Sequence, residues 1–168
     1  MNIEFKINKN RSQKIVFYLI LTVLLMMISG CSKDTSEKNN VDFKQITSAI
    51  EMSVNSENMT LSQNPSKSLK RFYGLNISDY EDLVLYSPSS SMDVSELMII
   101  KLSDDTQIDA VELSIEARVA AQLESFGGYA PEQCALLEDY IIKVKNNYVF
   151  YAVGENAEDL KKAFIDTI

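Results

Sequence analysis

Apolar residues beyond the first quarter of the chain follow two spacings, one of three to four residues and one of two. Behind Asp42, which can cap a helix, they recur at the helical spacing over 43–54. Asn64 followed by Pro65 combines a good N-cap with proline at the first helical position. This dipeptide predicts a short helix over 66–73, which the next glycine ends.

Two segments with strand character follow, over 80–86 and 95–102, and a loop rich in serine joins them. Positions 97–100 (Leu-Met-Ile-Ile) are all apolar, so both faces of a strand at this place are apolar. This pattern indicates a central strand covered on both faces. A long helical pattern over 105–126 comes next. Two consecutive glycines end it, because glycine takes the left-handed backbone at little steric cost. A brief helix over 131–137 begins at the following proline.

The clearest hairpin spans 139–153, with Asn146 and Asn147 as its two-residue turn. This turn predicts three cross-strand pairs on one apolar face, namely Val144 with Val149, Ile142 with Tyr151 and Tyr140 with Val153. The other face carries Ile141, Lys143, Lys145, Tyr148 and Phe150. Asn156 then caps a last helix over 157–168.

The predicted fold is a single α+β domain over 41–168. Its strand–strand–helix order occurs twice, at about 80–126 and 138–168. The simplest architecture is a four-stranded, mostly antiparallel sheet with these two helices on one face. The N-terminal helices are expected to cover part of the other face.

The start of the chain has the pattern of a bacterial lipoprotein signal. Residues 1–14 are basic, and residues 15–28 are uncharged and span about 21 Å as a helix, less than the roughly 30 Å membrane core. Ile28-Ser-Gly-Cys31 resembles a lipobox, in which small residues precede a lipid-modified cysteine. We therefore expect a signal peptide over 1–30, cleavage between Gly30 and Cys31, and a diacylglyceryl group on Cys31. The alternative is an uncleaved signal anchor with a coincidental cysteine.

The segment 31–40 is then a lipidated, flexible tether. Residues 32–40 are polar, and a flexible chain of nine residues has an end-to-end distance of roughly 15–18 Å. This distance is enough to clear the lipid headgroups. Two acyl chains on Cys31 supply stable anchoring. The expected location is the cell membrane, with the domain outside the cytoplasm and the lipid as its membrane contact.

Charge and composition exclude several classes of function. The net charge is −8, and about −11 once residues 1–30 are removed, which argues against binding nucleic acid. The chain has no histidine, so catalytic triads that use it and the usual zinc ligands are excluded. We predict no catalytic residue, metal or cofactor. After lipidation Cys134 is the only thiol left, and its acidic neighbours favour a buried, inert group over a reactive one.

Three features are candidates for binding. Arg118 is the only arginine in the long, acidic helix and can bind an anion; the alternative is a pair with Gln122, Glu96 or another carboxylate. Tyr129 lies in a Gly-Gly-Tyr-Ala-Pro link that is otherwise a helix stop and start. The hairpin face with Lys143, Lys145, Tyr148 and Phe150 can stack sugars or hold peptides. If the N-terminal helices cover this face, it is a second core.

Several segments resemble a known family. They are 96–101 (Glu-Leu-Met-Ile-Ile-Lys), Arg118, 126–131 (Phe-Gly-Gly-Tyr-Ala-Pro) and 147–151 (Asn-Tyr-Val-Phe-Tyr). Over about 70–155 the chain is similar to uncharacterised lipoproteins of clostridia-like Gram-positive bacteria, the domain-of-unknown-function family 4358. This resemblance implies an exported, membrane-tethered domain and brings no activity, ligand or catalytic residue.

Three functions remain open at this point. The first is a non-catalytic module that binds an envelope protein, peptide or polymer, as the anchor and the lack of catalytic residues suggest. The second is a carboxylate-dependent enzyme of the cell envelope, which needs two carboxyl groups about 5–10 Å apart in a cleft. The third is a solute-binding lipoprotein of a transporter, for which the chain is small.

Overall fold

Five antiparallel strands form one sheet in the computed structural model, which describes residues 41–55 and 57–168. The strands are β1 (Met59–Leu61), β2 (Asp82–Pro88), β3 (Glu96–Lys101), β4 (Ile141–Lys145) and β5 (Tyr148–Val153), in the order β1-β2-β3-β5-β4. The α+β class is confirmed, but the sheet has one strand more than the predicted four. The additional strand β1 has only three residues, too few to show an alternating pattern in the sequence.

Two helices have the N-caps that the sequence predicts, and the predicted helix over 105–126 begins with a 3-10 turn at Asp105–Gln107. The helices are α2 (Phe43–Glu51), α3 (Pro65–Tyr73), α4 (Ile108–Phe126), α5 (Pro131–Glu138) and α6 (Ala157–Thr167). The Asp42 carboxylate accepts a hydrogen bond from the Lys44 amide, and Asn64 accepts one from the Lys67 amide, both at 3.1 Å. Asn156 does not cap α6 as predicted. Its side-chain nitrogen donates instead to the Ser53 carbonyl at 2.9 Å.

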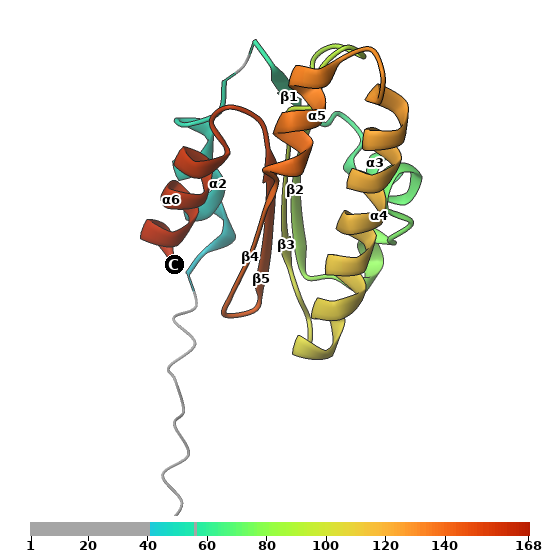
Figure 1. Cartoon of the computed structure of the whole chain (residues 1–168). Helices are drawn as coiled ribbons and strands as arrows, with labels where there is room; N and C mark the ends of the chain where they lie inside the picture. Colours follow the sequence, from blue (N-terminus) through green and yellow to red (C-terminus); the bar gives the residue numbers. More distant parts are fainter. Residues whose placement is uncertain (1–40, 56) are drawn as a thin grey trace, which may run out of the picture. The chain divides into compact units, whose positions relative to one another are not determined.

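Helices cover both faces of the sheet (Figure 1). On one face α3, α4 and α5 share a core with Met98 and Tyr151. On the other face α2 and α6 share a second core with Ile99 and Phe150.

The prediction that the helices now labelled α4 and α6 lie on one face is therefore wrong. The reason is β5, all of whose residues are buried, so that each of its faces needs a cover. The N-terminal helices divide in the same way, since α2 lies with α6 and α3 lies with α4.

The register of the β4–β5 hairpin is as predicted. Ile142 lies opposite Tyr151 and Val144 opposite Val149, and Asn146 in the turn has a φ of 54°. β5 also pairs with β3, with Tyr151 opposite Met98, which makes β5 a central strand. The two strand–strand–helix units are thereby joined into one sheet.

The two glycines after α4 end the helix, and each is required for a different reason. Gly128 has a φ of 91°, the left-handed conformation that the sequence predicts here. Gly127 has an ordinary φ, but a Cβ at this position would lie 2.9 Å from the Leu123 carbonyl oxygen. Side chains are therefore excluded at the two positions for different reasons.

The described residues belong to one compact unit, Asn39–Ile168. The predicted signal peptide over 1–30, the lipidation site Cys31 and the tether over 31–40 lie outside the described residues. Within the described part, no helix is long and apolar enough to cross a membrane.

Candidate functional site

A buried ion pair lies in the core beneath α4. Glu96 is the first residue of β3, and its side chain is fully buried. The Nε of Arg118, midway along α4, donates to its Oε2 at 3.2 Å. The Arg118 guanidinium also lies 4.5 Å from the centre of the Phe72 ring. The structure thus shows the alternative interpretation of Arg118, a salt bridge to Glu96, in place of a free anion site.

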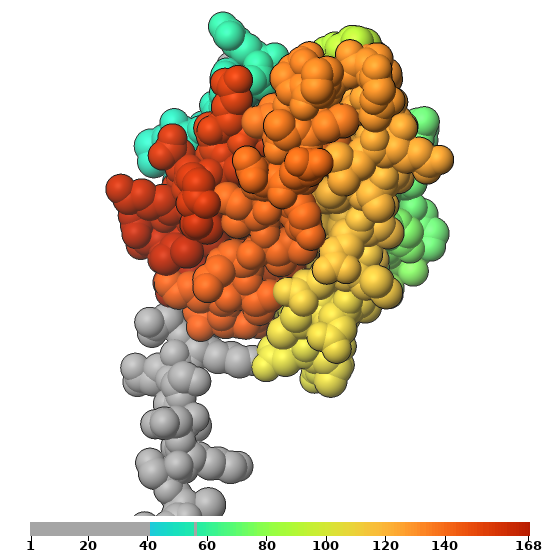
Figure 2. All heavy atoms as spheres, in the orientation of Figure 1, coloured from blue at the N-terminus to red at the C-terminus, as the bar shows by residue number. Residues whose placement is uncertain are grey.

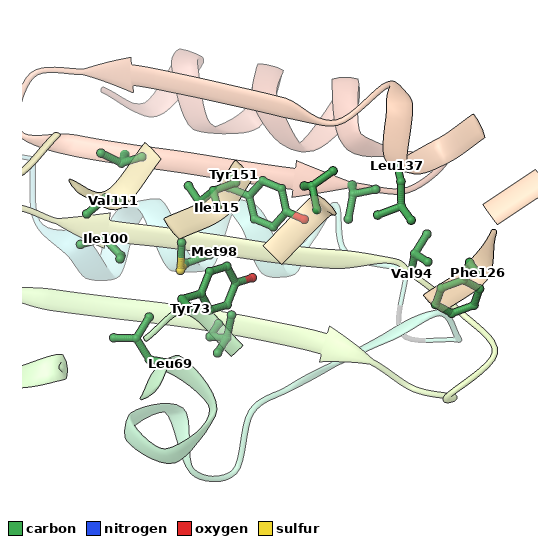
Figure 3. Close-up of a cluster of buried hydrophobic side chains, with 14 of the residues drawn as sticks. Leu69, Tyr73, Val94, Met98, Ile100, Val111, Ile115, Phe126, Leu137 and Tyr151 are labelled. Carbon is green, nitrogen blue, oxygen red and sulfur yellow. The ribbon is translucent and has the colours of Figure 1, made fainter. Parts of the chain in front are cut away.

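Two tyrosines extend this pair. The rings of Tyr73 on α3 and Tyr151 on β5 meet edge to face, 6.3 Å apart. In Figure 3 both hydroxyl groups point toward the Val94 end of β3, the end at which Glu96 lies. We call the set of Tyr73, Glu96, Arg118 and Tyr151 the buried polar cluster. The two hydroxyls, Glu96 Oε1 and Gln122 Oε1 are buried and have no hydrogen bond of good geometry.

Burial governs the ionisation of this cluster. It raises the pKa of Glu96, although the Arg118 charge opposes the shift. Burial and the negative charge of Glu96 together raise the pKa values of Tyr73 and Tyr151 well above their usual range. The Tyr73 hydroxyl also interacts with the carboxyl and lowers its pKa, although the two groups do not have hydrogen-bond geometry here. The cluster contains a single carboxyl group, so it does not supply the pair that glycoside hydrolysis needs.

A groove runs along the outer edge of β2, and we call it the β2-edge groove. It has a volume of about 300 Å³. Its lining residues are Phe43, Thr47 and Glu51 of α2, Leu61, Ser62 and Pro65 near β1 and α3, and Leu83, Val84 and Leu85 of β2. These walls are mainly apolar, with Glu51 as their charged residue.

The floor of this groove is an open strand edge. β1 pairs only with the end of β2, residues 86–88, and the Ser62 amide then donates to the Leu85 carbonyl at 2.8 Å. Alternate residues of a strand direct their backbone groups to the same side, so those of Leu83 also face outward. The Leu83 amide donates to its neighbour Asp82 at 3.0 Å. β3 pairs with the inner side of this stretch, where Leu83 lies opposite Ile100, and no strand of the described residues pairs with its outer side.

A second hollow, of about 410 Å³, lies where α6 meets α5 and the end of β5. Figure 2 shows this face of the molecule, on which the red surface of α6 adjoins the orange surface that includes α5. Asp139, Glu155 and Glu158 line the hollow, and Glu158 forms an ion pair with Lys161. Among the residues that the structure describes, no group of acidic, histidine or cysteine side chains is placed to hold a metal ion.

The aromatic part of the predicted basic and aromatic face of the hairpin is buried. Tyr148 and Phe150 are buried in the second core, because α2 and α6 pack over them. The Tyr148 hydroxyl donates to the Val41 carbonyl at 3.0 Å. Lys145 Nζ donates to the Ile165 carbonyl at 2.9 Å, and Lys143 is exposed. The binding role proposed for this face is corrected to a structural one.

Tyr129 is the remaining predicted candidate. It is 57% exposed in the link between α4 and α5, and its ring stacks on Phe126 with 5.7 Å between centroids. It lines neither the β2-edge groove nor the hollow beside α6. Sequence reasoning missed the groove, since it depends on where the three-residue β1 stops. Leu61, an apolar side chain that the fold leaves exposed, lines it.

The family of the chain follows from a comparison with known families. The model of the family described as "Domain of unknown function (DUF4358)" matches residues 52–154. The chain belongs to this family. The DUF4358 match extends from the end of α2 through β5, so it includes the buried polar cluster and the β2 floor of the groove. The α2 wall of the groove and helix α6 lie outside it. No curated protein and no solved structure matches the chain.

Proposed function

We propose that this DUF4358 protein is a lipid-anchored, non-catalytic binding module that holds a protein or peptide of the cell envelope outside the cytoplasm. The support for the anchor is the sequence, in which a basic start, a short apolar segment and a lipobox-like motif lead to Cys31. The support for binding is the β2-edge groove, which joins apolar walls to an open strand edge. Such a combination suits recognition of another chain.

The test of this function is crosslinking in intact cells. A photoreactive amino acid replaces Leu61 in the groove or, as a matched control, Leu113 on α4; the two side chains are 52% and 67% exposed. We expect the Leu61 position to capture an exported protein, identified by mass spectrometry, and the Leu113 position not to do so. Equal capture at both positions, or none at Leu61, would reject the groove as the binding surface.

A second candidate is a carboxylate-dependent enzyme of the cell envelope. The hollow beside α6 favours it, because Asp139, Glu155 and Glu158 share its lining. Burial raises the pKa of Glu96, and a general acid needs a raised pKa. Glu96 does not line this hollow, however. Release of fragments from purified cell wall by the wild type, lost in Glu155→Gln and in Asp139→Asn, would favour the enzyme over the binding module.

The solute-binding alternative has less support. A transporter's binding protein closes two lobes around its solute, and such a clamp needs two units that move relative to each other. The described residues form a single compact unit. We therefore place this alternative after the other two.

A further inference from the structure

The β2-edge groove has the features of a site for one class of ligand. We propose that it binds an extended, basic peptide segment by strand addition, in line with β1 and against the open part of β2. This inference rests on the proposed binding function and names the chemistry of its ligand. Three observations support it, and they concern the backbone, the shape of the groove and its charge.

The backbone observation is the outward peptide group of Leu83. β1 occupies the edge of β2 only as far as the bond from Ser62 to Leu85, so Leu83 is the next residue that faces the groove. Its amide already donates to a carboxylate, that of Asp82. An incoming strand replaces this local bond with a cross-strand one, and it gains the Leu83 carbonyl as an acceptor.

The shape of the groove fits alternate side chains of such a strand. Every second side chain of an added strand points to the same face of the sheet. The groove has walls on both faces, Phe43 and Thr47 of α2 on one and Pro65 of α3 on the other. Its volume of about 300 Å³ has room for side chains of moderate size. One set of peptide side chains can therefore contact α2 and the other the start of α3.

The charge of the groove selects a basic segment. Glu51 lines the groove, and no lysine or arginine is among the lining residues. Asp82 precedes Leu83 on the floor and lies opposite Lys101 of β3, which offsets part of its charge, so Glu51 supplies most of the negative charge. The Glu51 charge acts over β2, since it adds to the effect of burial in raising the pKa of Tyr86. A second copy of this chain would bring its own Glu51 and Asp82 to the same edge. Repulsion between like charges disfavours that dimer and favours a ligand with lysine or arginine.

The test uses the full chain in neutral detergent micelles and three fluorescent peptides. The first alternates lysine with valine, the second is the same peptide with N-methylated backbone amides, and the third alternates glutamate with valine. Fluorescence anisotropy measures binding to each at low salt. We expect the lysine peptide to bind, N-methylation to weaken binding at least tenfold through lost backbone hydrogen bonds, and the glutamate peptide not to bind.

Three variants locate the site on the protein. Leu83→Pro removes the outward amide, and proline is tolerated on an edge strand where that amide faces solvent. Glu51→Lys reverses the charge of the groove, and Glu116→Lys makes the same change on the exposed side of α4. We expect at least tenfold weaker binding for the first two variants and less than twofold for the third. The N-methylated peptide probes the same hydrogen bonds without changing the protein, so a folding defect in Leu83→Pro does not affect that arm.

Two outcomes would overturn the proposal. One is equal binding of the methylated and unmethylated lysine peptides, which would mean contact through charge alone. The other is concentration-dependent dimerisation in sedimentation velocity that Leu83→Pro abolishes, which would make a second copy the occupant. The in-cell crosslinking tests the proposed function independently of this experiment. If the lysine peptide binds but no exported partner is captured, the proposed function is rejected and strand addition is retained. If an exported partner is captured and its capture does not depend on Leu83 or Glu51, strand addition is rejected and the proposed function is retained.

Discussion

The Arg118 guanidinium approaches the Glu96 carboxylate to 3.2 Å, and the two side chains differ in their access to water. Glu96 is fully buried at the start of β3, whereas the side chain of Arg118 retains 17% exposure on α4. The carboxylate therefore depends on the guanidinium for its solvation, while the guanidinium also has water and the Phe72 ring. This asymmetry decides what each substitution in the pair does.

Replacement of Arg118 by methionine leaves the Glu96 carboxylate without its partner. Breaking a buried pair from one side costs about 3–5 kcal/mol. Since the carboxyl can escape part of this cost by taking up a proton, we expect a loss of about 2–3 kcal/mol in the free energy of unfolding at neutral pH. Urea denaturation measures it.

Arg71→Met is the matched control. Arg71 also lies over the Phe72 ring, at 5.3 Å, but its residue is exposed, and no salt bridge to it is present among the described side chains. We expect its replacement to cost less than about 1 kcal/mol. Equal costs for the two arginines would show that the ring contact, and not the buried carboxylate, gives Arg118 its importance.

The raised pKa of Glu96 predicts a specific pH dependence. Because burial raises this pKa in the folded protein, the folded state binds the proton more tightly than the unfolded chain. The stabilisation is fully present below the unfolded pKa of about 4.3 and is lost as the pH rises through the folded pKa. The free energy of unfolding of the wild type, minus that of Glu96→Gln, is therefore expected to fall over this window and to stay constant above it.

Urea titrations at a series of pH values, from about 4 to 8, measure this difference. Glu116→Gln makes the same substitution at an exposed position of α4 and is measured in parallel. A difference between wild type and Glu96→Gln that rises with pH would mean that Arg118 outweighs burial and lowers the pKa of Glu96.

The two faces of the hairpin predict very different costs for truncation. Phe150 is fully buried and stacks on Phe164 at 5.1 Å, whereas Lys143 on the neighbouring strand is exposed. Phe150→Ala should lower the free energy of unfolding by about 3–5 kcal/mol through lost burial and a cavity. Lys143→Ala should change it by less than about 0.5 kcal/mol. A small effect of Phe150→Ala would contradict the burial of this side chain in the second core. It would favour the exposed face that the sequence alone allowed.

Local signals were sufficient for much of the fold. The caps Asp42 and Asn64 act within three residues, and the Asn146-Asn147 turn sets the hairpin register by itself. The face on which α6 packs depends on β5 pairing with β3, a contact between strands about fifty residues apart. No periodicity within α6 reports which face of the sheet it will cover, and the prediction failed there.

The sites follow the same division. A lone arginine in an acidic helix pointed to an ion pair with Glu96 among other acids, but only the packing of α4 on β3 selects that partner. The β2-edge groove has no motif, because its floor is the part of β2 that β1 is too short to reach. The burial of Tyr148 and Phe150 could not be predicted, because an aromatic strand face has the same sequence pattern whether helices or solvent cover it.

The lipid anchor gives the last prediction, and the two cysteines of the chain provide the variant and its control. Cells grown with an alkyne-bearing fatty acid should label the wild type and Cys134→Ser equally, because Cys134 is a partly buried, free thiol within the domain. Cys31→Ser should remove the label, since no thiol then follows the predicted cleavage site. Mass spectrometry of the wild-type N-terminus should show a lipidated Cys31 as the first residue. Persistence of the label in Cys31→Ser, or an intact leader on the exported protein, would remove the anchor from the proposed function and leave the groove to be explained without it.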